Sequence, residues 1–273
     1  MVKMTDRDWR PRYIQLAEEL RQKIESGALR PDTPMPSEAD LADSSGLSRT
    51  SVRNAIRQLR EWGLVRAEQG RGTFIRAARK RVVRKNTDRY QWEKNRVHET
   101  EKERRSAGGT EFDTGLAVGN LRFYAEYRVI EAPEELAELF GISKGAKLLQ
   151  RDYHTTAQAE EAPLGMSRSY IPHDIVAQNP ALLDQANEPW PGGTQHQLFT
   201  VGIELDSITD HLTARPPLPH EAELLGIESG VSVIAIRKVS KDTAGRVVEI
   251  ADAVYAGDRA EMVYEIMLER WNP

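Results

Sequence analysis

The feature that most constrains the fold is an internal repeat in the second half of the chain, with a constant offset that relates position 137 to position 222. Residues 137–142, Ala-Glu-Leu-Phe-Gly-Ile, recur at 222–227 as Ala-Glu-Leu-Leu-Gly-Ile. Without a gap, the same offset relates Leu148 to Val233 and Tyr170 to Tyr255. The repeat predicts two copies of one unit, each a helix, a tight turn and a β-hairpin.

The strand pattern of this half indicates the fold class. Gly141 and Gly226 follow the two repeated helices as C-caps. Alternating apolar residues and flanking turn residues predict six strands, over 121–130, 146–156, 163–171, 231–240, 246–256 and from about Met262 to Leu268. Residues 111–273 are therefore expected to form an α+β domain in which helices cover an antiparallel sheet.

Residues 1–76 show a different pattern, three helices followed by a hairpin. Apolar residues recur at helical spacing from Arg12 to Ser26. Ser37 and Ser48 stand where they can cap a second and a third helix. Two β-prone runs then flank the turn Gly70-Arg71-Gly72. A helix, a short turn and a second helix present a recognition helix to the DNA major groove, and the hairpin is a wing suited to phosphates or the minor groove.

Charge divides the chain in the same place. Residues 1–110 hold 25 Lys+Arg and 16 Asp+Glu, whereas residues 111–273 hold 13 and 26. A basic module favours a polyanion, because neutralising phosphates releases counterions. Arg49, Arg53 and Arg57 line one face of the third helix, and along the chain no acid follows them until Glu61. Such a row suits an anionic ligand; alone, it could also be a solvated helix face.

The stretch between the two halves is long, polar and basic. Eleven Lys+Arg lie from Arg79 to Arg105, and Tyr90 and Trp92 are its only aromatic residues. Such a composition offers little core of its own, so residues 77–110 are interpreted as a basic linker. It is either a strap on the DNA backbone or a solvated connector. The predicted domains are thus 1–76, 77–110 and 111–273.

Several classes of function are not expected. The chain has no cysteine, which excludes a disulfide framework and a thiolate zinc site. No apolar stretch is long enough for a membrane span and the amino terminus lacks a signal-peptide core, so we expect a cytoplasmic protein without a membrane partner. The six histidines, at 98, 154, 173, 196, 211 and 220, show no metal-binding spacing, and no metal or other cofactor is expected.

One motif offers an enzyme as an alternative. Residues 141–145, Gly-Ile-Ser-Lys-Gly, fit the G-x-S-x-G pattern of a nucleophile elbow. That elbow needs a strand before the serine and a helix after it, and here the predicted order is reversed. A hydrolase that uses Ser143 is therefore kept only as the alternative, and no catalytic residue is expected.

The run PSEADLADSSGLSRTSVRNAIRQLREWGLVRAEQGRGTFI resembles the winged helix-turn-helix of the GntR superfamily of bacterial transcription regulators. The resemblance covers the chain from its start to about residue 76 and implies contacts with operator DNA. The resemblance assigns these contacts to Arg49, Thr50, Arg53, Gln69, Gly70 and Arg71. Ser48, Arg57 and Gly72, on the same helix and wing, complete the expected DNA-binding residues. One position departs from the pattern, because Ala39 stands where the family usually has an arginine.

Residues 111–273 resemble the effector-binding UTRA domain of the HutC subfamily, which has a chorismate-lyase-like fold. The supporting stretches are Ser169-Tyr170-Ile171-Pro172, the segment from Gly192 to Ile203, and Val248-Glu249 with Gly257-Asp258-Arg259. In that family the ligand lies between the two hairpin units. By position, the implied effector-binding residues are Arg151, Tyr153, Arg168, Ser169, Tyr170, Thr194 and Glu249.

Arg151 is the most informative of these residues. Its repeat mate is Ile236, so one copy of the unit places a guanidinium where the other keeps an apolar residue. A charge in that position needs a partner, which is either an acidic effector or an internal carboxylate, Glu249 or Asp252. Relatives that bind phosphorylated amino sugars often have arginine in place of Tyr153 and glutamate in place of Ser167, so the chain departs from that class.

Together these patterns predict a transcription regulator, more specifically a repressor, that binds double-stranded operator DNA with an inverted repeat as a homodimer. A small-molecule effector in the carboxyl-terminal domain, acidic if it pairs with Arg151, is expected to change the spacing of the two DNA-binding domains. A constitutive DNA-binding protein without an effector is the second alternative.

Overall fold

A computed structural model describes residues 9–77, 81–227, 230–268 and 270–271 of the chain. The chain divides into two compact units, one of residues 1–79 with 227–231 and one of residues 80–226 with 232–273. In the described ranges, none of the helices combines the length and the apolar character that a membrane crossing requires.

The amino-terminal unit begins with three helices, α1 (Arg12–Glu25), α2 (Glu38–Ser45) and α3 (Arg49–Glu61). Ser37 caps α2 by accepting from the backbone N–H of Asp40, whose carboxylate accepts in return from the N–H of Ser37. Gly46 ends α2 with φ of 66°, a left-handed conformation that favours glycine. Ser48 then caps α3. The turn between α2 and α3 is thus fixed at both ends by the residues expected from the sequence.

A β-hairpin follows α3. Strand β1 (Val65–Glu68) pairs antiparallel with β2 (Gly72–Ile75), and Gly70 has φ of 73° in the turn between them. The chain before α2 lies along β2, since the N–H of Met35 donates to the carbonyl of Thr73 at 2.8 Å. The predicted wing is present.

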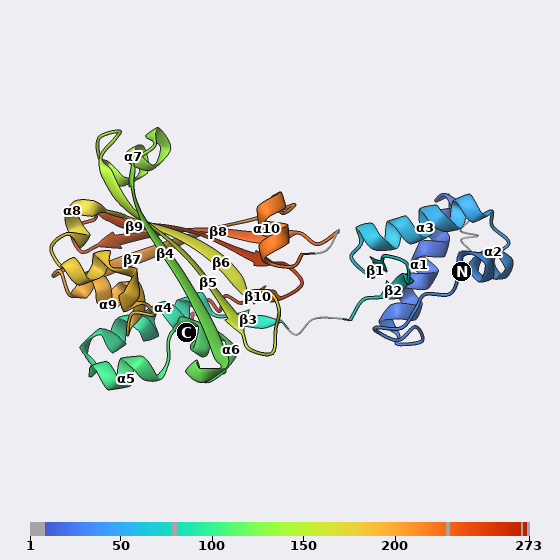
Figure 1. The fold of residues 1–273 in the computed structure, drawn as a ribbon, viewed down its shortest axis with the longest axis horizontal. Helices are drawn as coiled ribbons and strands as arrows, with labels where there is room; N and C mark the ends of the chain where they lie inside the picture. The colour runs from blue at the N-terminus through green and yellow to red at the C-terminus, as the bar shows by residue number, and fades with distance from the viewer. Residues whose placement is uncertain (1–8, 78–80, 228–229, 269, 272–273) are drawn as a thin grey trace. The chain divides into compact units, whose positions relative to one another are not determined.

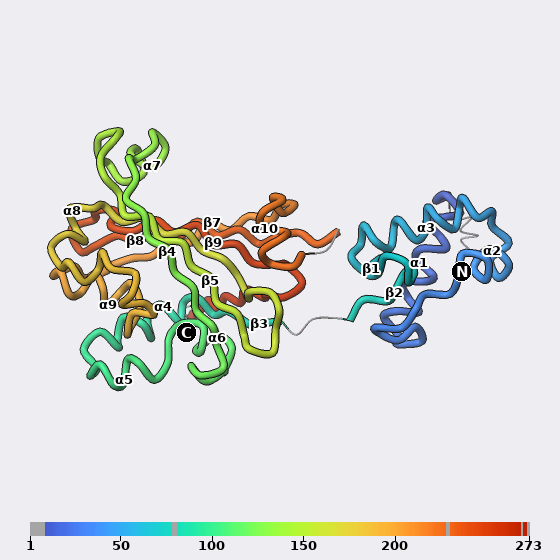
Figure 2. Tube along the Cα trace, viewed as in Figure 1, coloured from blue at the N-terminus to red at the C-terminus, as the bar shows by residue number. Residues whose placement is uncertain are grey.

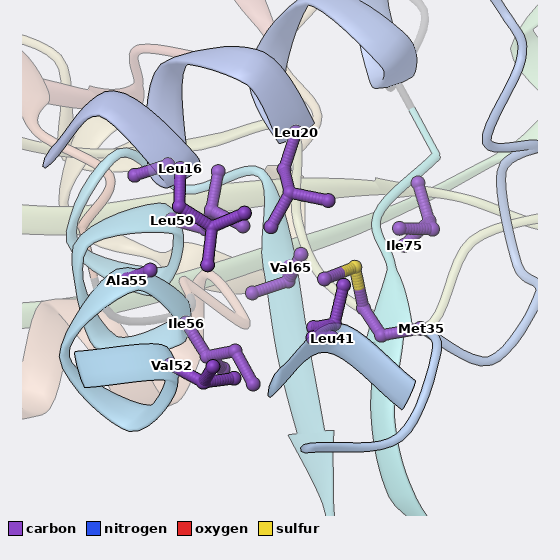
Figure 3. Close-up of a cluster of buried hydrophobic side chains, with 11 residues drawn as sticks. Leu16, Leu20, Met35, Leu41, Val52, Ala55, Ile56, Leu59, Val65 and Ile75 are labelled. Atoms are coloured by element: carbon purple, nitrogen blue, oxygen red, sulfur yellow. The ribbon is translucent and has the colours of Figure 1, made fainter. Parts of the chain in front are cut away.

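Eleven buried apolar side chains form the core of this unit. They come from all three helices, from the hairpin and, for Met35, from the segment before α2, and Figure 3 shows them meeting between the helices. Each helix buries one stripe: Leu16 and Leu20 from α1, Leu41 from α2, and Val52 and Leu59 from α3. Burying this stripe leaves the opposite face of α3 in solvent.

The second unit is built on a six-stranded antiparallel sheet of order β4-β5-β6-β9-β8-β7 (Figure 1). The bounds are β4 Leu121–Glu131, β5 Lys147–Ala157, β6 Gly165–Pro172, β7 Leu205–Arg215, β8 Val233–Asp242 and β9 Val247–Ala256. This confirms the α+β class with an antiparallel sheet. Strand β7 was not among the predicted strands, although the offset of the repeat makes it the counterpart of β4.

The two repeats meet at the centre of the sheet, where β6 and β9 pair antiparallel with Arg168 opposite Asp252. Each repeat carries one short helix between its first two strands, α7 (Glu134–Phe140) and α10 (Pro219–Leu224). The strand expected from about Met262 to Leu268 is instead the short β10 (Ala260–Met262), which pairs parallel with β3 (Val82–Arg84). Residues 263–268 form no strand.

The basic segment 81–114 is folded and belongs to the second unit. After β3 it forms α4 (Asn86–Asn95), η1 (Arg96–His98), α5 (Glu101–Ser106) and α6 (Gly109–Thr114). It is called the connector below. Arg79 and Lys80, which belong to the predicted basic linker, lie outside the described residues.

Polar side chains with specific partners attach the connector to the sheet. The amide of Asn86 donates to Asp210 Oδ2 at 2.7 Å, and the hydroxyl of Tyr90 donates to the same carboxylate at 3.0 Å. The ammonium of Lys94 donates to the carbonyl of Leu205 at 2.7 Å. The amino-acid composition suggested a linker because the segment has few aliphatic residues. Hydrogen bonds between polar side chains that are distant in the sequence cannot be read from composition. The boundaries at 76 and 110 remain a proposal.

A group of short helices follows β6: α8 (His173–Val176), η3 (Pro180–Leu183), η4 (Gln185–Asn187) and α9 (Gly193–Phe199). Their apolar residues pack on the sheet in a core that includes Leu149, Ile171, Leu182, Leu198 and Val248. Helix α9 contacts both α4 and η1 of the connector, and in Figures 1 and 2 α4, α5, α6 and α9 gather on one side of the sheet. The sheet, α9 and the connector thereby surround the site described next.

Candidate DNA-binding and effector sites

The nine residues expected to contact DNA lie at the start of α3, one helical turn further along it at Arg53 and two at Arg57, and on the wing. All nine are exposed: Ser48, Arg49, Thr50, Arg53, Arg57, Gln69, Gly70, Arg71 and Gly72. Residues at the start of a recognition helix reach base edges first, and backbone without side chains at Gly70 and Gly72 allows close approach to phosphates. The arrangement has the layout of a winged helix-turn-helix.

Two of the arginines have acidic partners that helical spacing did not reveal. Arg53 Nε donates to Glu38 Oε2 at 2.7 Å, from α3 to the first residue of α2. Arg71 on the wing pairs with Glu68 of β1. The expectation of an arginine row without acids before Glu61 is therefore wrong for Arg53, because Glu38 approaches from the neighbouring helix. Exposed pairs of this kind contribute about 0–1 kcal/mol, so a phosphate can replace the carboxylate.

The second unit contains a cavity of about 750 Å³ between the sheet, α9 and the connector. Four residues expected to bind effector line it: Tyr153, Ser169, Thr194 and Glu249. The size lies within the range of small-molecule sites, which span about 300–1,000 Å³. The remaining wall includes aromatic side chains, namely Trp92, Phe123, Trp190 and Tyr255, and charged ones that are mostly arginines.

Arg151 is only 1% exposed and lies within a hydrogen-bonded network beside this cavity. Its Nη2 donates to Ser169 Oγ at 2.6 Å, to Glu249 Oε1 at 3.1 Å and to Thr194 Oγ1 at 3.3 Å. Lys238 Nζ contacts the other oxygen of Glu249 at 2.8 Å. Of the partners considered from the sequence, Glu249 is the one present, whereas Asp252 pairs with Arg237. Both Nη atoms of the buried guanidinium are thus paired within the protein, whereas its Nε has no hydrogen-bond partner among the described residues.

A second carboxylate, Glu188, organises the neighbouring wall. The hydroxyls of Tyr153, at 2.9 Å, and of Tyr127 donate to its Oε1, as does the amide of Gln197 at 3.0 Å. Gln197 also accepts from Arg151 Nη1. Sequence reasoning missed Glu188, Gln197 and Lys238. For Lys238 the repeat offers a signal, because its mate across the repeat is Tyr153, itself an expected site residue.

Burial and charge shift the pKa values of these groups. Burial raises the pKa of Glu249, but Lys238 and Arg151 lower it more strongly, to about 2. Burial raises the pKa of Tyr127 to about 12, with a smaller opposing contribution from Arg151. Burial also raises the pKa of Tyr153 well above its usual range. At neutral pH the cavity wall therefore presents an ionised Glu249 and the neutral phenol of Tyr153, with the neutral phenol of Tyr127 beside it.

Arg168 and Tyr170 lie elsewhere. Successive residues of a strand point to opposite faces, so these two share the face of β6 opposite to Ser169. Arg168 Nε donates to Asp152 Oδ1 at 2.5 Å, and neither Arg168 nor Tyr170 lines the cavity. The implied site therefore divides, with five residues at or beside the cavity and two across the sheet.

The motif that suggested an enzyme lies in a turn. Ser143 is exposed between α7 and β5, with the helix first and the strand second. In the repeat, the corresponding Glu228 and Ser229 lie outside the described residues. Throughout the described ranges, no three His, Asp or Glu side chains gather in a way that could hold a metal ion.

An exposed recognition helix and wing, joined in one chain to a domain with a cavity of ligand size, define the class of DNA-binding transcription regulators that respond to a small molecule. The family profile for "Bacterial regulatory proteins, gntR family" matches residues 12–75, and that for the UTRA domain matches residues 124–261. The chain belongs to the GntR family of bacterial transcription regulators and carries a UTRA domain.

Relatives match the chain over nearly its full length. It is 26% identical over 259 residues to the HTH-type transcriptional repressor NagR of Bacillus subtilis, which covers 93% of this chain and 94% of the relative. It is 26% identical over 242 residues to the HTH-type transcriptional regulator GgaR of Escherichia coli, covering 88% and 84%. A crystal structure of a GntR-family transcriptional regulator superimposes with a TM-score of 0.67 at 25% identity, covering 95% and 99%.

Proposed function

We propose that the protein is a homodimeric repressor of the HutC subfamily that binds an operator with an inverted repeat and is released by a small molecule. One short recognition helix reads few bases, so two helices related by a two-fold axis are needed for useful specificity. A repressor in this family works on DNA in the bacterial cytoplasm, at the nucleoid. The relative NagR is named a transcriptional repressor, which supports repression over activation.

The observation that carries the DNA-binding half of the proposal is the exposure of all nine expected contact residues on α3 and the wing. Glu38 and Glu68 pair with Arg53 and Arg71 in the free protein and must give way to DNA. On DNA, Arg53 is assigned to base edges and Arg71 to phosphate, while Ser48, Arg49, Thr50, Arg57 and Gln69 complete the contacts.

The cavity of the second unit is assigned to the effector. Ser169, Thr194 and Glu249 in its wall are hydrogen-bonded to Arg151, and none of the described groups forms a nucleophile and base pair. We therefore assign binding and no catalysis, and the site consists of Tyr153, Ser169, Thr194 and Glu249, with Arg151 behind them. Because Glu249 already neutralises Arg151, the effector does not need to be acidic.

An operator titration tests this function. Full-length protein should bind a two-half-site inverted repeat at least about tenfold more tightly than a single half-site, in fluorescence anisotropy at fixed salt. Sedimentation of the free protein should give a dimer. Equal affinity for one and two half-sites, with a monomer in solution, would contradict the proposal.

A further inference from the structure

One segment of the second unit leaves its apolar side chains in solvent. It follows β10, consists of residues 263–268 with 270 and 271, and is called the apolar segment below. Four of its large apolar side chains are each at least 79% exposed: Ile266, Met267, Leu268 and Trp271. Elsewhere in the described part of the second unit, the most exposed large apolar side chain is that of Val129, at 53%. An apolar patch of this kind on a folded protein marks an interaction surface.

The sequence of the apolar segment is that of a β-strand, but its own chain offers it no strand partner. It is rich in β-branched and aromatic residues, and neither glycine nor proline occurs from 259 to 271. The parallel ladder between β10 and β3 ends at Met262, and the N–H of Val263 makes one more hydrogen bond, of 2.9 Å, to the carbonyl of Arg84. In the described chain, residues 264–268 pair with no strand. A strand-forming segment with free backbone groups is suited to pairing with a strand of another chain.

A second copy of the chain supplies a matching strand. Two copies that pair antiparallel about a two-fold axis offer each other the same residues in reverse order. With the axis between positions 267 and 268, Glu265 stands opposite Arg270 of the partner subunit, and the symmetry gives this pair twice. Both charged side chains are exposed, and within the described residues neither forms an ion pair. The charges of the segment are thus complementary to those of its own copy.

The apolar surface is also large enough for a dimer. Burying one isoleucine, methionine or leucine side chain removes about 100 Å² of apolar surface from water. A tryptophan removes about 200 Å². Two copies of the apolar segment therefore bury about 1,000 Å² of apolar side chain, which reaches the area of about 1,000 Å² that a specific interface requires.

We propose that the apolar segments of two copies pair antiparallel across a two-fold axis and form the dimer contact of the protein. The segment follows β10, which pairs with β3 at the start of the connector. The contact therefore joins the two copies near the place where each chain leads to its DNA-binding unit. This inference rests on the proposed function, because it takes the protein as a homodimer.

Substitution of the apolar side chains tests the surface. Ile266→Asp combined with Leu268→Asp, in the full chain, should weaken the dimer by at least about 100-fold in sedimentation equilibrium, because four carboxylates then enter the contact. Both side chains are exposed, so the circular dichroism spectrum should stay that of the wild type. Val129→Asp, which places the same charge on the exposed edge strand β4, is the matched control and should leave the dimer intact.

Charge reversal tests the pairing itself with little change of shape. Glu265→Arg and Arg270→Glu should each weaken the dimer by about tenfold or more, because each turns two attractive pairs into two repulsive ones. Mixing the two variant proteins should restore association, since in the mixed dimer every arginine faces a glutamate of the other chain. An ion pair within one chain would not be restored by mixing.

The outcomes separate this inference from the proposed function. A dimer that persists in the aspartate variant, or no recovery on mixing the reversed variants, would overturn the assigned surface and leave the homodimer in place. Loss of the dimer in Val129→Asp alone would place the contact at β4 and overturn the surface as well. A wild-type protein that sediments as a monomer would instead contradict the proposed function.

Discussion

Arg53 of the recognition helix donates from Nε to Oε2 of Glu38 at 2.7 Å, and so links α3 to the first residue of α2. Both side chains are substantially exposed, 67% for Arg53 and 40% for Glu38. In high dielectric such a pair is weak, but it fixes one arrangement of the guanidinium and holds a negative charge beside the surface assigned to DNA. The pair therefore competes with DNA for Arg53.

Removing the negative charge should strengthen DNA binding. Glu38→Gln is expected to raise affinity for operator and for unrelated DNA by up to about fivefold, because Arg53 is released and a repulsive carboxylate is gone. The melting temperature should hardly change. Anisotropy titrations at several salt concentrations measure this. Glu134→Gln, which breaks the exposed pair with Lys144 in the other unit, is the matched control. A weaker operator complex for Glu38→Gln would mean that Glu38 itself contacts DNA.

The helix and the wing should differ in what their arginines do. Arg53→Ala is expected to weaken specific binding by about 1–3 kcal/mol if the side chain reads a guanine, with little effect on unrelated DNA. Arg71→Ala should weaken binding to all sequences and reduce the salt slope by about one. Arg128→Ala, whose arginine pairs with Glu126 in the effector domain, serves as the control. Unchanged binding by both variants would refute the DNA-binding assignment.

Local signals made the amino-terminal unit largely predictable. Each signal involves residues close together in the sequence: the capping serines at 37 and 48, the apolar spacing of the helices and the glycines of the wing. The structure has these helices and this hairpin. The pairing of Arg53 with Glu38 was not predictable in this way, because it depends on the crossing of two helices.

In the second unit the repeat predicted the central strands but was not used to its full length. Applied to 121–130, the same offset would have given β7, which the alternation of its own residues did not reveal. The packing of the connector on the sheet was not predicted, because it rests on polar contacts such as that of Tyr90 with Asp210, which lie far apart in the sequence. Glu188 in the cavity wall was missed for the same reason, since no local pattern marks it.

Acid should destabilise the effector domain through Glu249. Its pKa in the folded protein, about 2, lies below its ordinary value of 4.5, so the folded state binds this proton less readily than the unfolded state. The stabilisation is fully present above about pH 4.5 and is lost as the pH falls towards 2, with an amplitude on the order of 3 kcal/mol. Urea unfolding at several pH values should show a steeper loss for the wild type than for Glu249→Gln. Parallel pH profiles would contradict the assigned pKa.

The last prediction distinguishes a residue that stabilises the cavity from a residue that contacts the effector. Arg151→Ala leaves Glu249 with one cation fewer and removes the partner of Ser169 and Gln197, so it should destabilise the domain by about 3–5 kcal/mol. Thr194→Val loses one long hydrogen bond, of 3.3 Å to Arg151, and should change stability by less than about 1 kcal/mol. Because Thr194 lines the cavity, this variant should keep wild-type operator affinity and still lose most of the release by effector. Unfolding free energy, operator affinity and release, measured on the same samples, distinguish the two roles. A stable Arg151→Ala protein that responds fully to effector would show that the buried network supports neither the fold nor the ligand site.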